Sequence, residues 1–283
     1  MTLYDYNNLK ESFDTDKMLA TLMKSHGESP PYTELTYRRN EVIMEEGTPN
    51  RHFYVVKKGM VAMSKGTARD DSILTFCGPD DILGFLSVLE NAVSPISYTA
   101  ISEVTLFRFE RQYVIDKITF GQESFWYAYF FYLNFTHPIL VRESLSNLPS
   151  DKKILAGLVI VAERFGRAEP DGSYLIPYYF TQKVIGKYLN LARAYVATNL
   201  RKLEQDGLIS LSPKPWKIHD MAAVKEILDM KYTDLYSLTK KMKNEPVSFY
   251  VTGFLLQKCD DFLTEYAFFW KWIQIYSDNK PTF

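Results

Sequence analysis

The chain has 283 residues, of which 46% are hydrophobic and 24% are charged, and its formal net charge is −1 at pH 7. This composition is that of a globular chain long enough for two domains, and it excludes a largely disordered protein. Two cysteines are too few for a disulfide framework, so we expect a reducing compartment. The polar start differs from a signal peptide, and no apolar run approaches the roughly 20 residues that cross a bilayer. We therefore expect a cytoplasmic protein with no membrane partner.

Residues 1–118 predict an N-terminal helix followed by an antiparallel, jelly-roll-like β-roll. After a helical lead-in, the chain changes near Tyr32 to short runs rich in β-branched and aromatic residues. Turns that contain Gly and Pro, such as 78–81, separate these runs. Many short strands spaced in this way are typical of a sandwich or roll. The predicted strands are Glu41–Met44, Phe53–Val56, Val61–Ser64, Ser72–Phe76 and Thr105–Phe109.

Residues 119–148 predict a long dimerisation helix. The run 122–146 is too continuous and too aromatic for a strand, and Pro138 should kink or interrupt the helix. A helix that is apolar around most of its circumference needs cover on more than one side. Packing within the monomer could supply that cover, but we favour a partner subunit on one side and therefore expect a homodimer.

Residues 149–228 predict a winged helical domain. Ser150 should cap an amphipathic helix that Gly166 closes, and an extended run, Ser173–Phe180, should follow it. Further on, the segment 206–216 contains Gly207 and two prolines, and it predicts a strand and turn that form the wing.

Between these elements lies a pattern typical of a helix-turn-helix. Thr181 is a good N-cap for a short helix that contains Gly186, where glycine costs about 1 kcal/mol relative to alanine. We interpret this glycine as a point of close approach between two helices. Asn190 follows, and it is one of the few residues other than glycine that tolerates the left-handed conformation. A second helix should then run from about Ala192 to Gln205.

The second helix predicts two different faces. Val196, Leu200 and Leu203 form a narrow stripe toward the core, and the opposite face is small, polar and cationic. The stripe alone does not indicate DNA binding, because two amphipathic helices that only pack together would also have one. The interior glycine, the asparagine turn, the wing and a local excess of lysine and arginine favour a helix that enters the DNA major groove. The outward residues are Arg193, Ala194, Tyr195, Thr198, Arg201 and Lys202, and Lys187 adds to the cationic excess.

The run TQKVIGKYLNLARAYVATNLRKLEQDGLIS (181–210) resembles the helix-turn-helix of the Crp/Fnr family of bacterial regulators over its whole length. The segments EEGTPNRHFYVVKKGMVAM (45–63) and GPDDILG (78–84) are similar to the β-roll of that family. The resemblance covers about 35–228 and implies an α+β protein with a sensor roll, a dimerisation helix and a winged helix-turn-helix. It also implies a transcription regulator that binds a pseudo-palindromic site on double-stranded DNA, with RNA polymerase as a further partner.

The resemblance assigns roles to individual residues. Arg193 matches the arginine that commonly reads a guanine in this family. Ala194 and Thr198 occupy the next two base-reading positions, where cyclic-AMP-responsive members have a glutamate and an arginine, so the half-site should differ from theirs. Residues that match positions contacting phosphate or sugar are Thr181, Gln182 and Tyr195.

The ligand-binding segment departs from the family pattern. Cyclic-nucleotide binders have a glutamate directly after the glycine that matches Gly84, and an arginine–serine pair about ten residues later, because a cyclic phosphate needs a charged clamp. This chain has Phe85 and Ser94-Pro95-Ile96 there, so we expect no control by cyclic AMP. A small apolar or aromatic effector and control by abundance alone both stay open. The candidate effector-binding residues are Gly84, Phe85, Leu86, Ser94, Ile96, Tyr129 and Tyr132.

We expect no cofactor, metal or enzymatic activity. Cys77 is isolated, the four histidines have no ligand spacing, and the chain has no Gly-rich phosphate loop or nucleophile elbow. Residues 229–283 predict a helical C-terminal extension that the family pattern does not cover. This extension could pack back on the rest of the chain, bind another protein or make a second dimer contact. A ligand-sensing or scaffold protein that acts through the extension without binding DNA is the alternative function.

Overall fold

The computed structural model describes residues 15–24, 31–66, 72–87, 93–119 and 124–228. The extension predicted at 229–283 lies outside these residues. Helix α2 (Thr15–Met23) falls within the predicted lead-in helix. Within the described ranges, no helix has the length and apolar content needed to cross a membrane.

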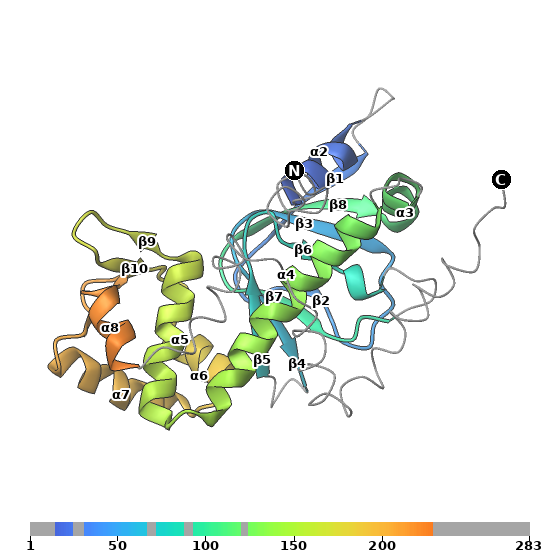
Figure 1. Cartoon of the computed structure of the whole chain (residues 1–283). Helices are drawn as coiled ribbons and strands as arrows, with labels where there is room; N and C mark the ends of the chain where they lie inside the picture. The colour runs from blue at the N-terminus through green and yellow to red at the C-terminus, as the bar shows by residue number, and fades with distance from the viewer. Residues whose placement is uncertain (1–14, 25–30, 67–71, 88–92, 120–123, 229–283) are drawn as a thin grey trace, which may run out of the picture.

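The N-terminal part is a β-roll of two four-stranded antiparallel sheets, as predicted (Figure 1). One sheet has the strand order β1-β8-β3-β6, and the other has the order β2-β7-β4-β5. Strands β1, β6 and β7 were not among the predicted strands. The bounds are β1 Tyr32–Tyr37, β2 Val42–Met44, β3 His52–Lys58, β4 Val61–Lys65, β5 Ser72–Cys77, β6 Ile82–Leu83, β7 Ser97–Ala100 and β8 Val104–Glu110.

Strand β3 is buried on both of its faces, which explains its continuous apolar run. Side chains alternate along a strand, so Val56 points with Leu106 into the core between the two sheets. Phe53 and Val55 point to the other side and pack against helices α2 and α3 (Arg111–Thr119). A strand covered on both faces loses the polar alternation of a half-exposed strand.

Helix α4 (Ser124–Ser144) runs from the β-roll to the C-terminal helical domain (Figure 1). It continues through Pro138 as a single helix, so of the two predicted effects of this proline the interruption is wrong. Phe135 and Ile139 pack on the core of the roll, whereas Val141 belongs to the core of the helical domain. One helix therefore contributes to both cores.

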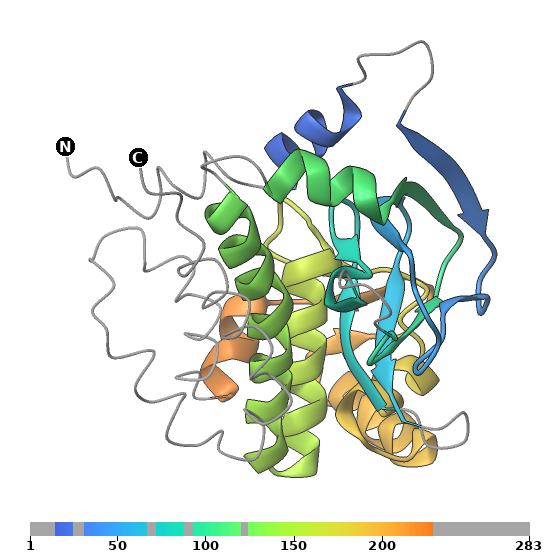
Figure 2. The same ribbon diagram turned by 90° about the vertical axis from the view of Figure 1, so that its right-hand side faces the viewer.

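The helical domain combines helices with a small antiparallel sheet of order β11-β12-β10-β9. In Figure 2, helix α5 is seen end to end in this domain. The elements after α4 are η2 Leu145–Asn147, α5 Ser150–Phe165, β9 Arg167–Ala168, β10 Tyr174–Ile176, α6 Gln182–Leu189, α7 Arg193–Gln205, β11 Ile209–Ser210, β12 Trp216–Ile218 and α8 Met221–Ile227.

Of the two predicted ends of α5, the end at Gly166 is confirmed and the cap at Ser150 is wrong. Ser150 is the first helical residue, and Pro149 occupies the N-cap without a side-chain hydrogen bond. Gly166 has a φ of −80°, so it closes the helix in an extended conformation and not in the left-handed one. A Cβ atom at Gly166 would lie 2.4 Å from the carbonyl oxygen of Ala162 and 2.8 Å from that of Leu175. Glycine is required there by lack of space.

The predicted extended run Ser173–Phe180 is a strand only at its start. Strand β10 ends at Ile176, and the backbone N–H of Phe180 donates to the carbonyl oxygen of Pro177 over 3.0 Å. The chain turns at this proline because Pro has no N–H with which to continue the ladder. As a result, Ile176 and Phe180 are buried, whereas Tyr178 between them is 62% exposed.

A continuous core joins the helical domain to the β-roll. Met60 and Phe76 of the roll belong to the same buried cluster as Ile154 and Leu158 of α5. The ring of Phe76 lies 4.9 Å from the ring of Phe180, centroid to centroid, in an edge-to-face arrangement. The helical domain therefore packs directly against strand β5 in this arrangement.

Candidate nucleic-acid interface

Helices α6 and α7 form a helix-turn-helix with the predicted local chemistry. The side chain of Thr181 accepts a hydrogen bond from the N–H of Val184 over 3.4 Å and caps α6. Asn190 has a φ of 55° and a ψ of 46°, which is the predicted left-handed conformation. A Cβ atom at Gly186 would lie 2.7 Å from the carbonyl oxygen of Leu191, so the close approach is to the turn, whereas α7 itself is no nearer than 3.7 Å.

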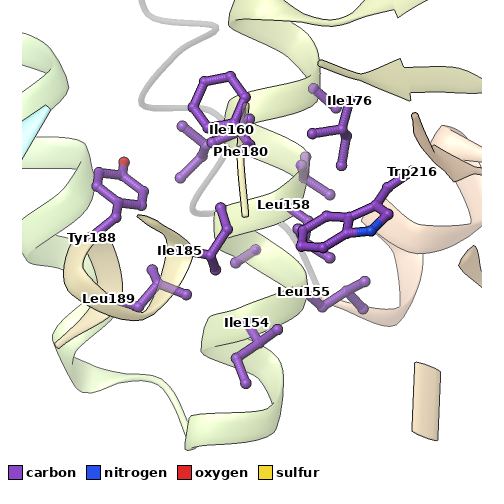
Figure 3. Close-up of a cluster of buried hydrophobic side chains, with 14 of the residues drawn as sticks. Ile154, Leu155, Leu158, Ile160, Ile176, Phe180, Ile185, Tyr188, Leu189 and Trp216 are labelled. Atoms are coloured by element: carbon purple, nitrogen blue, oxygen red, sulfur yellow. The ribbon is translucent and has the colours of Figure 1, made fainter. Parts of the chain in front are cut away.

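The inner sides of both helices pack on α5. Figure 3 shows Ile185 and Leu189 of α6 directed toward Ile154 and other side chains of α5. On α7, Val196 and Leu200 are fully buried in the same cluster, and Leu203 is partly buried against it. The predicted stripe thus holds α7 on the domain by one narrow edge.

The outer side of α7 is open to solvent. Tyr195 is 42% exposed, and the other side chains of this face are exposed as well. The structure brings together the six residues predicted on this face, and it places Thr181 and Gln182, both half-buried, at the start of α6. Lys187 is also half-buried on α6. The exposed six are Arg193, Ala194, Tyr195, Thr198, Arg201 and Lys202.

Hydrogen bonds within α7 define what this face can offer to a base. The hydroxyl of Thr198 donates to the carbonyl oxygen of Ala194 over 3.1 Å. With its proton used in this way, the Thr198 oxygen is left as an acceptor and its methyl group as an apolar contact. Arg193 supplies only donors, in a planar fork that suits the O6 and N7 atoms of guanine. The face therefore presents donors, an acceptor and methyl groups within the first two turns of the helix.

A wing follows α7, as predicted. Strands β11 and β12 pair in antiparallel fashion, and their connection carries the exposed Lys214. The N–H of Leu211 donates to Oε1 of Glu204 over 2.8 Å, which ties the wing to the last turn of α7. The wing and α7 are thus held in one fixed relation.

Lys217, which belongs to the cationic segment around the helix-turn-helix, forms an ion pair with Asp171. Nζ of Lys217 lies 3.0 Å from Oδ2 of Asp171, at the tip between β9 and β10. Hydrogen bonds from Ser173 and Lys217 hold the pKa of Asp171 below its usual range. The local excess of lysine and arginine includes Lys217, and the sequence does not indicate this pairing because Asp171 is 46 residues away in the chain.

Sequence reasoning missed Tyr178, which lies beside the start of α6. Its ring is 62% exposed and packs against the ring of Tyr179, with 5.5 Å between centroids. A strict strand pattern would bury it with Ile176 and Phe180, and only Pro177 signals the turn that exposes it.

The described candidate effector-binding residues belong to different packing clusters. The ring of Phe85 packs against Phe131 of α4, with 4.0 Å between centroids, whereas Ile96 is 4% exposed in the core between the sheets. The hydroxyl of Ser94 donates to the carbonyl oxygen of Ile96 over 2.6 Å. Gly84 and Leu86 flank Phe85, Tyr132 is half-buried on α4, and the side chain of Tyr129 lies outside the described residues.

A small, half-open cleft lies beside α4, and its walls are formed by other residues. Arg164 of α5 crosses one end, where it donates to Thr75 over 2.9 Å and lies 3.5 Å from Oδ2 of Asp81. Burial raises the pKa of the Cys77 thiol, so this cysteine packs there as a neutral, apolar side chain. The wall residues are Thr75, Cys77, Asp81, Ile82, Phe131, Asn134, Phe135 and Arg164.

Two family models match the chain. Residues 34–119 match the cyclic nucleotide-binding domain, and residues 153–227 match the Crp-like helix-turn-helix domain. The chain is also 24% identical, over 189 residues, to the CRP-like cAMP-activated global transcriptional regulator of Mycobacterium tuberculosis. That match covers 65% of this chain and 83% of the relative.

Solved structures share the fold. FixK2 from Bradyrhizobium japonicum aligns with a TM-score of 0.60 at 20% identity, over 69% of this chain and 96% of FixK2. A cyclic nucleotide-binding domain containing protein from Listeria monocytogenes aligns with a TM-score of 0.61 at 16% identity, over 73% and 98% of the two chains. With a β-roll of the cyclic nucleotide-binding type followed by a Crp-like helix-turn-helix, the chain belongs to the Crp/Fnr family and is a DNA-binding transcription regulator.

Proposed function

We propose that the protein binds a pseudo-palindromic promoter site as a homodimer and that cyclic AMP does not control it. The observation that carries this proposal is the exposed outer face of α7, with Arg193 at its first position and Thr198 as an acceptor one turn later. Arg193 would read a guanine, and Ala194 and Thr198 would select the neighbouring bases. Tyr195, Thr181, Gln182, Lys187, Arg201 and Lys202 would contact the phosphate and sugar backbone.

Helix α4 supports the proposed dimer. Its inner side is covered by the roll through Phe131 and Phe135. Leu140, near its C-terminal end, is 38% exposed, and an apolar residue at this position suits a second copy of the same helix. Two subunits paired through α4 would place their α7 helices about one DNA turn apart, roughly 34 Å.

The proposal that cyclic AMP has no role rests on the residues at the family's clamp positions. Phe85 stands where a nucleotide-binding member has a carboxylate, and its ring is engaged with Phe131. An aromatic ring cannot accept hydrogen bonds from a ribose hydroxyl as a carboxylate does. An apolar effector that separates these two rings, or control by protein abundance, would fit the same residues.

The proposed role is one of binding, without catalysis, and RNA polymerase is the expected protein partner at a promoter. A regulator that binds chromosomal DNA works in the cytoplasm, so we expect the protein there. Turnover of a small molecule by the purified protein would contradict the non-enzymatic part of this proposal.

The test is selection of bound duplexes from a random DNA pool, followed by affinity measurements at several salt concentrations. We expect an enriched inverted repeat and an affinity that falls steeply with salt, because lysine and arginine displace counterions from phosphates. The absence of an enriched motif, together with salt-insensitive or absent binding, would refute the proposal. That result would favour the scaffold function, with its partner site in 229–283.

A further inference from the structure

The contact between the roll and the helix-turn-helix includes a group of four polar residues that the DNA-reading face does not use. We name this group the Arg142 junction, and it comes from four different elements: Arg142 from α4, Ser72 from β5, Tyr188 from α6 and Asn190 from the turn before α7. Nε of Arg142 donates to the carbonyl oxygen of Tyr188 over 2.9 Å. Nη2 of Arg142 donates to Oγ of Ser72 over 2.7 Å.

Ser72 links Arg142 to Asn190 in the turn by two hydrogen bonds. Its hydroxyl accepts from Arg142 and donates to Oδ1 of Asn190 over 2.7 Å. The remaining guanidinium nitrogen, Nη1, lies 3.3 Å from Oε2 of Glu143 on the same helix. All three nitrogens of Arg142 are therefore engaged, and two of them bind elements other than α4.

The physical chemistry of the junction favours a fixed geometry. The side chain of Arg142 is only 11% exposed, so each lost hydrogen bond would leave a poorly solvated donor. The carbonyl of Tyr188 lies at the C-terminal end of α6, where carbonyls have no partner within the helix and the helix dipole favours a cation. A planar guanidinium can serve two acceptors at fixed angles, which the single ammonium of lysine cannot do.

We propose that Arg142 is a positioning residue that sets the orientation of α7 relative to α4, and so the half-site spacing that the dimer accepts. This inference rests on the proposed function, because it needs two subunits that pair through α4 and read two half-sites. Arg142 lies on the dimerisation helix, and Asn190 precedes the reading helix by three residues. The junction is therefore a short polar path from the dimer axis to the DNA-reading element.

The experiment uses the full-length protein and the inverted repeat selected by the wild type. Dissociation constants are measured for the selected spacing, for spacings one and two base pairs longer, and for an isolated half-site. The variants are Arg142→Ala, Ser72→Ala and Asn190→Gly. Glycine keeps the left-handed turn that Asn190 adopts but removes Oδ1. Arg39→Ala, on an exposed turn of the roll, is the control for loss of one positive charge.

We expect the three junction variants to lose about fivefold or more of the affinity difference between the selected and the altered spacings, the lower end of typical coupling between sites. Affinity for the isolated half-site should stay close to that of the wild type, and so should the spacing preference of Arg39→Ala. Ser72→Ala and Asn190→Gly carry the test if Arg142→Ala does not fold, because both changes are small.

Two results would overturn the inference. An unchanged spacing preference in Ser72→Ala and Asn190→Gly would show that the junction does not orient α7. An equal loss of affinity for the half-site and the full site, with a lower melting temperature, would reduce Arg142 to a purely structural role. If the wild type itself selects no inverted repeat, the proposed function fails first, and that outcome is distinct from both.

Discussion

Helix α7, the proposed DNA-reading helix, and the family's effector segment differ in how far their side chains are exposed to solvent. On α7, the residues with the proposed chemistry all lie on one exposed side, opposite a stripe of buried Val196 and Leu200. In the roll, Phe85 packs against α4 and Ile96 packs between the sheets, in two separate clusters. A reading face needs one helix with two sides, whereas a ligand pocket needs several distant elements to leave a space. The spacing of residues along one helix predicts such a face. A pocket depends on which side chains from distant elements fill the interior, and local spacing does not predict it.

The largest effect that we expect concerns the interior of the roll. Ile96→Ala should lower the free energy of unfolding by about 2–5 kcal/mol, because Ile96 is core and its truncation leaves a cavity. Denaturant unfolding of the full-length chain measures this loss. A change below about 0.5 kcal/mol, which is typical of surface positions, would show that Ile96 lines an open pocket.

An alanine substitution on the exposed face of α7 should affect DNA binding and leave stability almost unchanged. Lys202→Ala should leave the free energy of unfolding within about 0.5 kcal/mol of the wild type, since Lys202 is exposed. If Lys202 contacts a phosphate, the slope of log affinity against log salt should become shallower by about 1, and by the same amount on every sequence. An unaltered slope would place Lys202 off the DNA.

The smallest effect that we expect is that of cyclic AMP. A ligand present at 100 times its dissociation constant stabilises a folded protein by about 2.7 kcal/mol, which thermal unfolding detects easily. We expect no shift of the melting temperature and no change of DNA affinity with millimolar cyclic AMP, because Phe85 replaces the expected carboxylate. A clear stabilisation would mean that another group on this chain binds the nucleotide.

The helix-turn-helix could be predicted from the sequence because its determinants lie within 25 residues of one another. Thr181 caps the first helix, Asn190 takes the left-handed turn, and Gly186 permits the close approach of that turn. Each of these features depends on backbone geometry that one residue type satisfies better than the others. The order of a β-roll, a long helix and a winged domain followed from the same kind of local pattern and from the resemblance to a family.

The features that the sequence did not predict depend on distant neighbours. The steric reason for the glycine at 166 includes the carbonyl of Leu175 on another element, and the pairing of Lys217 with Asp171 joins two hairpins. The Arg142 junction brings together residues 70 positions apart, Arg142 and Ser72, and no periodicity in either element indicates that contact. Such contacts become visible only when the fold places the elements side by side.

The most direct test of the central claim, that the outer face of α7 reads DNA, is a binding-site selection with Arg193→Ala beside the wild type. We expect the variant to lose about 1–3 kcal/mol of discrimination at one base position of each half-site, where the wild type selects guanine. Preferences at the other positions should persist. An identical enriched sequence for the two proteins would contradict the account, because the first residue of α7 would then have no part in the choice of sequence.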